Sequence, residues 1–227
     1  MDNQTDVMLI ACKMMEQEIR FSMERKKCSF IVEWIDSQLH KSPKRLRDKV
    51  QLIIAEHPNH DTFLLALAQC GNAFIGLRSM HATLVLPKFA DCIHLLRSFK
   101  NGDRGEIDNR TIYFTGDWLE GSNTILAEYR QFEMKHGTEK AQKIYRRIMA
   151  EYRHLSMIDT GAYDMGKASV FGHETAGILG LDYGCVPGTV RVLDELFSNN
   201  WRKEFIVIPP ESQIREEDFD ISISEGQ

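Results

Sequence analysis

The chain has 227 residues, which is enough to bury a substantial hydrophobic core without disulfides. Its net charge of −5 shows no basic excess, so nucleic acid is not an expected partner. No apolar run approaches the length of a membrane helix, and the N-terminus lacks the basic start and long apolar core of a signal peptide. We therefore expect a cytoplasmic protein with neither nucleic-acid nor membrane partners.

The first part of the chain alternates strand and helix patterns. Apolar runs predict strands at residues 7–11, 29–35, 62–68 and 82–86. Helical patterns occupy residues 13–27, a segment that starts at Ser42-Pro43 and ends at His57-Pro58, and residues 91–96. Serine followed by proline is typical of a helix cap and a first helical position. The polar segment 100–110 is a candidate lobe boundary.

The second part continues the alternation. Strands are predicted at residues 111–115, 155–158 and 204–208, and a loop at 116–120. Helices are predicted at residues 124–136, along an apolar stripe from Ala141 towards Leu155, at 165–179 and at 190–197. This alternation predicts an α/β fold with a doubly wound, mostly parallel sheet. We expect one domain over residues 6–210, which could consist of two lobes that meet near residues 100–110. Residues 211–227 are expected to form a flexible acidic tail.

Five cysteines, an odd number without a CxxC pair, argue for reduced thiols in a cytoplasmic protein. Cys12 and Cys70 follow predicted strands, and Cys92 starts the helix after another strand. Because parallel strands end at one sheet edge, we expect these three thiols to meet there. A helix N-terminus lowers a thiol pKa, so Cys92 is expected to ionise most easily. Cys28, which starts a predicted strand, and Cys185, which lies in a turn rich in glycine and proline, are both interpreted as structural. Cys185 is also available as a fourth ligand.

Three thiolates predict a metal site. They could hold zinc with an open fourth position, our first choice, or three irons of a four-iron iron-sulfur cluster. The alternative is that the cysteines are small apolar core residues. Asp91 and Asp159 also follow strands and are candidate catalytic groups, although an N-cap or a turn explains each equally well. Trp118 and Tyr163 are candidate walls of a small-molecule pocket, although a tryptophan at that position can also fill the core.

Phosphate-loop, GxGxxG, HExxH and GxSxG motifs are absent from the sequence. Several other short groups of residues, spread over residues 6–209, form a combined pattern. They are Ile10-Ala11-Cys12, Ile35-Asp36, Leu39-His40, Pro43, Cys70-Gly71-Asn72, Gly76-Leu77, Leu86-Pro87, Asp91-Cys92, the loop 116–120, Asp159-Thr160-Gly161 and Tyr163. Together they resemble the bacterial and archaeal proteins grouped as domain of unknown function 1638. Lys13 and Ala90 depart from that pattern, which commonly has an acidic residue and a histidine there.

The resemblance implies an association with anaerobic one-carbon metabolism and with corrinoid-dependent methyltransferases. It also adds Asn72 to the candidate substrate-binding residues. Our leading hypothesis is a metal-thiolate protein of this metabolism, a zinc-dependent methyltransferase or an iron-sulfur enzyme if it is an enzyme. A corrinoid would then be reached through a partner protein or methyltransferase. The alternatives are a non-catalytic accessory protein that binds a small molecule or corrinoid with structural cysteines, and catalysis with Cys92 as nucleophile and His81, His94 or His40 as base.

Overall fold

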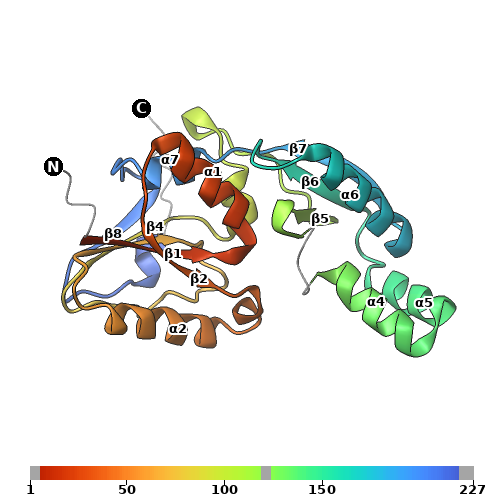
Figure 1. Cartoon of the computed structure of the whole chain (residues 1–227), viewed down its shortest axis with the longest axis horizontal. Helices are drawn as coiled ribbons and strands as arrows, with labels where there is room; N and C mark the ends of the chain where they lie inside the picture. The colour runs from red at the N-terminus through yellow and green to blue at the C-terminus, as the bar shows by residue number, and fades with distance from the viewer. Residues whose placement is uncertain (1–5, 119–123, 220–227) are drawn as a thin grey trace.

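The computed structural model describes residues 6–118 and 124–219 and contains two β-sheets in two lobes (Figure 1). The first lobe holds a sheet of five strands, and the second lobe holds a sheet of three strands. Both sheets alternate with helices along the chain, which confirms the predicted α/β class with mostly parallel strands. None of the helices in these described ranges has the length and apolar character that crossing a membrane requires.

The sheet of the first lobe has the strand order β2-β1-β3-β4-β8. Its strands are β1 (Val7–Cys12), β2 (Ile31–Ile35), β3 (Thr62–Ala66), β4 (Thr83–Pro87) and β8 (Phe205–Ile208). Strands β1 to β4 pair in parallel, whereas β8 runs antiparallel to β4. The carboxyl ends of β1, β3 and β4 therefore lie at one edge of the sheet, where ligands of such sheets usually bind.

Helices cover both faces of this sheet. In Figure 1, α1 (Glu16–Lys26) and α7 (Arg191–Leu196) lie on one face, and α2 (Pro43–Glu56) lies on the other. The Ser42 side chain caps α2 by accepting a hydrogen bond from the Arg45 backbone, and Pro43 occupies the first helical position, as predicted. The short helix α3 (Cys92–Leu96) follows β4. Short 3-10 turns are η2 (Lys13–Met15), η3 (Ser37–Lys41) and η4 (Lys100–Gly102).

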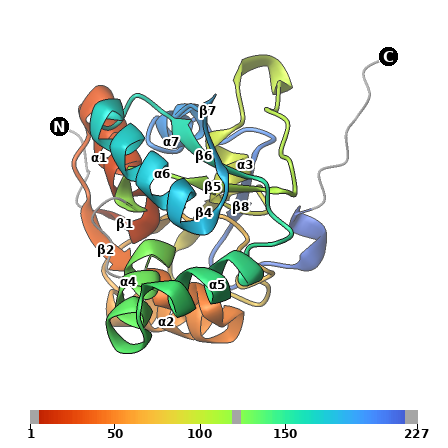
Figure 2. The same ribbon diagram turned by 90° about the vertical axis from the view of Figure 1, so that its right-hand side faces the viewer.

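The second lobe is a parallel sheet with its own helices. Its strands are β5 (Thr111–Phe114), β6 (His154–Asp159) and β7 (Asp182–Pro187), in that order. Figure 2 shows α6 (Met165–Leu179) across this sheet, and α4 (Ile125–His136) paired with α5 (Thr138–Ile148) below it. Phe114, Leu155 and Met157 from the strands pack with apolar residues of α6 in a separate core.

Two elements of the second lobe differ from the sequence prediction. Cys185 lies within strand β7, where we expected a turn, because an edge strand tolerates the glycine and the terminal proline of this segment. Helix α5 ends at Ile148, although the apolar stripe continues to Leu155. The backbone N–H groups of Arg153 and His154 both donate to the carbonyl of Arg110, which starts β6 beside β5.

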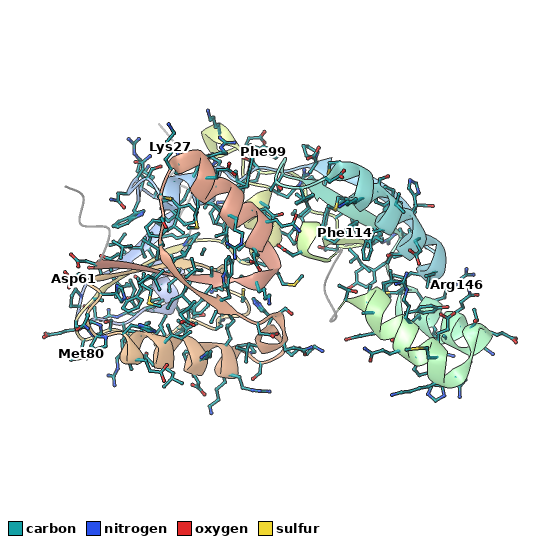
Figure 3. The ribbon with its side chains drawn as sticks, viewed as in Figure 1. Lys27, Asp61, Met80, Phe99, Phe114 and Arg146 are labelled. Carbon is teal, nitrogen blue, oxygen red and sulfur yellow. The ribbon has the colours of Figure 1, made fainter. Side chains whose placement is uncertain are left out.

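The predicted boundary segment 100–110 lies between α3 and β5, where the chain passes from the first lobe to the second. The chain returns between β7 and α7. Asp61 and Met80, which precede β3 and β4, lie at the amino edge of the first sheet and away from the second lobe, which contains Phe114 (Figure 3). The carboxyl edge of the first sheet therefore faces the second lobe.

Part of the acidic tail, which we expected to be flexible, packs on the first lobe. The Ile214 side chain is fully buried, and its backbone N–H donates to the carbonyl of Leu77 at 2.9 Å. Gln213 forms an isolated β-bridge with Arg78, and the turn η6 (Glu216–Phe219) follows. Residues 220–227 lie outside the described part of the chain. Two apolar residues within the charged tail therefore anchor it: Ile214 is buried, and Phe219 packs against the same core.

The buried position of Ile214 predicts that Ile214→Ala lowers the free energy of unfolding by about 2–4 kcal/mol, because it leaves a cavity under the tail. The control Glu216→Ala, at an exposed position of the same segment, should change it by less than about 0.5 kcal/mol. Urea unfolding followed by circular dichroism measures both values. Equal stability of Ile214→Ala and wild type would show that the tail does not contribute to the fold.

Candidate functional site

The three predicted thiols come together at the carboxyl edge of the first sheet. Cys12 is the last residue of β1. The loops that follow β3 and β4 run side by side, because the N–H of Cys70 donates to the carbonyl of Ala90 at 3.0 Å and the N–H of Gln69 donates to Phe89 at 2.8 Å. These two bonds place Cys70 beside the start of α3, where Cys92 lies.

Burial and mutual repulsion keep these thiols protonated at neutral pH. The pKa of Cys12 is raised to about 12 and that of Cys70 to about 11, in both cases mainly by burial. Burial also raises the pKa of Cys92 well above its ordinary value, and Cys12 and Cys70 raise it further. The expectation that Cys92 ionises most easily is therefore wrong. Helix α3 has a single short turn and cannot offset the loss of solvent around the sulfur.

His40 lies beside the first thiol. Its Nε2 is 3.4 Å from the Sγ of Cys12, and it comes from the turn η3 that follows β2. Burial lowers the pKa of His40, which favours the neutral imidazole at neutral pH. A neutral imidazole is a nitrogen donor for metal ions. From the sequence, His40 is predicted only as a candidate base, since its spacing from Cys12 does not match a metal-binding motif.

The loop after β3 holds Cys70 in an unusual backbone conformation. The φ angles of Cys70, Gly71 and Asn72 are 47°, 70° and 65°, so three consecutive residues are left-handed. Glycine adopts this conformation freely, but a cysteine there costs on the order of 1 kcal/mol or more. Strained backbone of this kind often occurs at functional sites. The Asn72 side chain is exposed and accepts a hydrogen bond from the Gln69 side chain at 2.6 Å.

Asp91 is the N-cap of α3. Its Oδ1 accepts hydrogen bonds from the backbone N–H of His94 at 2.9 Å and lies 2.7 Å from His94 Nδ1. The capping alternative for Asp91 is therefore confirmed. Asp91 also raises the pKa of Cys92, which places its carboxyl within electrostatic reach of the thiols.

The second lobe docks on the start of α1, and we call this contact the seam. It joins residues 12–18 of the first lobe to residues 115–117 and 159–163 of the second. The Thr115 hydroxyl donates to the carbonyl of Met14 at 3.0 Å. Asp117, in the turn η5 (Gly116–Trp118), accepts a hydrogen bond from the Gln17 backbone N–H at 3.2 Å. Asp117 thereby caps a helix that belongs to the other lobe.

Glu18 is a buried carboxyl in the seam. Its side chain is 0% exposed, and its Oε1 accepts a hydrogen bond from the Thr160 hydroxyl at 3.4 Å. Its Oε2 is also buried and has no hydrogen-bond partner among the described residues. Burial, followed by repulsion from Asp117, raises the pKa of Glu18 to about 8. Sequence analysis missed Glu18 because it lies on a helix with many charged residues.

The other predicted site residues lie in the second lobe, where Asp159 and Tyr163 make contacts that stabilise the local fold. Asp159 ends β6, and its Oδ1 accepts a hydrogen bond from the Gly161 backbone at 3.1 Å, as a turn predicts. The Tyr163 hydroxyl donates to the carbonyl of Ile158, and its ring packs so closely on Gly116 that a Cβ there would be 2.5 Å from it. Trp118 is a predicted wall of the pocket, but its side chain lies outside the described part of the structure.

The seam contains acidic side chains from both lobes. Cys12 and Cys70 both raise the pKa of Cys92, and Glu18 raises the pKa of Cys12 and of Cys92. In residues 6–118 and 124–219, however, no group of three or more His, Cys, Asp or Glu side chains is arranged so that it could hold a metal ion.

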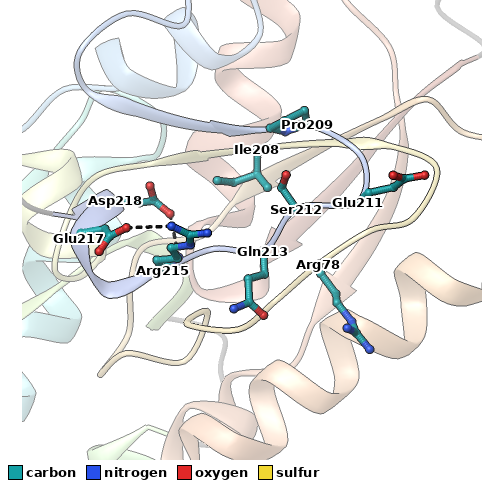
Figure 4. A pocket seen from close by; sticks show the side chains of 9 residues that line it. All are labelled: Arg78, Ile208, Pro209, Glu211, Ser212, Gln213, Arg215, Glu217 and Asp218. Carbon is teal, nitrogen blue, oxygen red and sulfur yellow. Dashed lines mark hydrogen bonds and ion pairs between the residues drawn. The ribbon is translucent and has the colours of Figure 1, made fainter.

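A surface hollow of about 460 Å³ lies at the opposite edge of the first sheet (Figure 4). It is lined by Arg78, by residues after β8 and by the tail. Three of its charged residues interact: Arg215 contacts Glu217 at 3.2 Å, and the Arg215 backbone donates to Asp218 at 2.7 Å. The hollow contains no cysteine, histidine or buried carboxyl, so we do not place the site there.

The fold and the seam define a two-lobed α/β protein with thiols and carboxyls between the carboxyl edges of its two sheets. A family model described as Protein of unknown function (DUF1638) matches residues 34–197, and the chain belongs to this family. The match includes Cys70 and Cys92 and begins after Cys12, so it is shorter than the resemblance over residues 6–209. No curated protein and no solved structure matches the chain significantly.

The left-handed conformation of Cys70 predicts that Cys70→Gly leaves the fold as stable as wild type or stabilises it by up to about 1 kcal/mol. The gain comes from relief of backbone strain, which offsets the lost side-chain contacts. The control Cys28→Gly, at a residue without a positive φ, should be destabilising. Urea unfolding of both variants measures the difference, and an equal loss of stability in the two would contradict the strain argument.

The raised pKa of Glu18 predicts a pH-dependent stability. Above the ordinary pKa of 4.5, the unfolded chain loses the Glu18 proton, whereas the folded protein keeps it up to about pH 8. The free energy of unfolding should therefore fall between pH 5 and pH 8, by on the order of a few kcal/mol. Glu18→Gln cannot ionise and should flatten this slope, whereas Glu24→Gln, at an exposed position on the same helix, should retain it. Urea unfolding at several pH values measures the slope, and identical slopes for all three proteins would refute this role of Glu18.

Proposed function

We propose that this protein binds a thiophilic metal ion at the carboxyl edge of the first sheet, beside the seam, with Cys12, Cys70 and Cys92 as the thiolate ligands. The observation that supports this most strongly is the meeting of three thiols from separate segments at one sheet edge, where Cys12 and Cys70 both act on the ionisation of Cys92. Zinc is the first choice. An iron-sulfur cluster on the same thiolates is the second choice.

The electrostatics of the seam favour a cation. The groups that act on Cys92 are themselves acids: Cys12, Cys70, Asp91 and Glu18. Burial raises the pKa of the three thiols and of Glu18, which stay protonated unless a positive charge compensates them. A divalent ion would lower the pKa values of these four groups together and draw the thiolates closer, and its binding would release protons. The left-handed loop at Cys70 is the segment whose movement would close the site.

The nitrogen beside Cys12 favours zinc over an iron-sulfur cluster. His40 Nε2 is 3.4 Å from the Cys12 sulfur and has a lowered pKa, so it is available as a neutral donor. Structural and catalytic zinc sites combine sulfur and nitrogen ligands. Most iron-sulfur clusters use cysteine thiolates alone. A set of three sulfurs with one nearby imidazole therefore suits zinc better.

For the reaction, we propose methyl-group transfer to or from a thiol, with a corrinoid supplied by a partner protein. Zinc would supply Lewis-acid chemistry that keeps a bound thiol deprotonated at neutral pH. The support for this part is the family resemblance and its context, together with a thiol-rich site between two lobes. Asn72, Trp118 and Tyr163 remain the proposed substrate-binding residues, and Asp91 and Asp159 the proposed catalytic carboxylates.

A metal-binding test follows from the thiol arrangement. We expect the wild-type protein to bind one equivalent of zinc, and Cys12→Ser, Cys70→Ser and Cys92→Ser each to weaken binding by at least about 100-fold, because a thiolate ligand is lost. The matched control is Cys28→Ser, whose thiol donates to the Met23 carbonyl away from the seam. Competition with a chromophoric chelator under anaerobic conditions measures the affinities. Unchanged zinc affinity in all three variants would refute the proposal.

The second candidate function is a non-catalytic protein that binds a small molecule or a corrinoid in the seam, with cysteines that only pack. The specific observation in its favour is Cys12, which is 2% exposed and has a pKa raised to about 12. A thiol in this state behaves like a small apolar side chain. This function predicts ligand binding that survives the three serine substitutions, whereas the metal proposal predicts its loss.

A further inference from the structure

A second hollow, of about 590 Å³, lies at the amino edge of the first sheet, and we call it the α2 hollow. Its walls are α2, residues 76–81 of the segment that leads into β4, and Gln213 of the tail. Figure 3 shows Met80 of this segment beside one end of α2 and away from the second lobe, so the α2 hollow is separate from the thiols. We propose that it binds a small organic phosphate, a phosphate monoester with an apolar body.

The positive charge of the α2 hollow comes from Arg47 and Arg78. In residues 6–118 and 124–219, neither guanidinium lies within ion-pair distance of a carboxylate. Figure 4 shows the Arg78 side chain pointing towards α2, away from Glu217 and Asp218 of the tail. Two guanidinium groups without a carboxylate partner favour an anionic ligand.

Hydrogen bonds to the backbone hold both arginines in place. The Gln51 side chain accepts from the Arg78 N–H at 3.2 Å and donates to the Arg78 carbonyl at 2.9 Å, which fixes the Arg78 backbone against α2 and leaves its guanidinium unbonded. Arg47 uses one N–H in a 2.9 Å bond to the Ile75 carbonyl. A phosphate monoester carries about two negative charges at neutral pH and three acceptor oxygens, which matches two guanidinium groups better than a carboxylate does.

The α2 hollow also has an apolar end. Ala55 and Pro58 line it together with Met80, a large apolar side chain that is 65% exposed. Arg47 and Ala55 are 55 − 47 = 8 residues apart, which corresponds to about 12 Å along the helix. The charged and the apolar lining are therefore separated along α2, and a ligand with an anionic head and an apolar body fits both.

His81 contributes an unpaired polar atom to the lining. Its ring packs edge-on against Phe63, with ring centroids 6.2 Å apart, and its backbone N–H donates to Ser79 Oγ at 3.3 Å. Its Nε2 is buried and has no hydrogen-bond partner among the described residues. Because buried polar atoms usually bond to protein, water or a ligand, the missing partner of His81 is a second indication that a polar molecule occupies this place.

Phenyl phosphate is the probe, and the methyl signals of carbon-13-labelled methionines in the full chain report where it binds. We expect the Met80 methyl, assigned with Met80→Leu, to shift saturably as phenyl phosphate is added. The Met134 methyl, which is 80% exposed in the second lobe, should not shift. The two methyls are matched in exposure, so a non-specific effect of the ligand would move both.

Arg78→Gln should weaken phenyl phosphate binding by about 10-fold or more, because charge-assisted bonds to the phosphate are lost. The matched control is Arg45→Gln, an exposed arginine of the same helix outside the lining, which should bind like wild type. Arg78→Lys keeps the charge without the planar fork and should lie between the two. Benzoate, with one charge, and inorganic phosphate, without a ring, should each bind more weakly than phenyl phosphate.

The outcomes separate the parts of the proposal. No saturable shift of Met80, equal shifts of Met80 and Met134, or unchanged affinity in Arg78→Gln would overturn the site. Benzoate bound as tightly as phenyl phosphate would overturn the phosphate assignment, and inorganic phosphate bound as tightly would overturn the apolar body. A selective Met80 shift that Arg78→Gln weakens and Arg45→Gln does not would support the site. Zinc binding by the thiols is independent of all these results, because the thiols lie at the opposite edge of the sheet.

Discussion

The docking of the second lobe on the start of α1 is the contact on which the site depends. Asp117 accepts hydrogen bonds from Gln17, and Thr160 donates to Glu18, so the carboxyl ends of β5 and β6 are tied to the same helical turn. This turn follows the strand that ends in Cys12. The docking encloses the carboxyl edge of the first sheet and removes Glu18 from solvent. Without it, the thiols would lie at an open sheet edge and Glu18 would be an ordinary helix residue.

Enclosure of this edge has an electrostatic cost. Burial raises the pKa of Cys12, Cys92 and Glu18, and each of these groups is made harder to ionise by acidic neighbours. Neutral acids in a protein interior are tolerable, but they contribute less than apolar side chains of the same size. The strained backbone at Cys70 adds to this cost. The proposed metal ion would offset these unfavourable terms, because its positive charge favours the ionised forms of the acids around it.

The sequence allowed a good prediction of the fold and part of the site. Apolar runs and the Ser42-Pro43 cap located most elements, and the rule that parallel strands end at one edge brought Cys12, Cys70 and Cys92 together. β7 was missed because glycine and proline hide an edge strand. Glu18 could not have been found, because its burial results from the docking of a lobe that begins about a hundred residues later, which no local pattern contains.

The central claim is that cysteine sulfurs from three chain segments bind one metal ion. X-ray absorption at the zinc edge of the anaerobically loaded protein tests it most directly, because sulfur and oxygen or nitrogen neighbours give different distances. The account predicts three sulfur ligands at about 2.3 Å and oxygen or nitrogen at about 2.0–2.2 Å. A spectrum with oxygen and nitrogen neighbours only would contradict it, since zinc would then be bound elsewhere and the thiols would serve only to pack the seam.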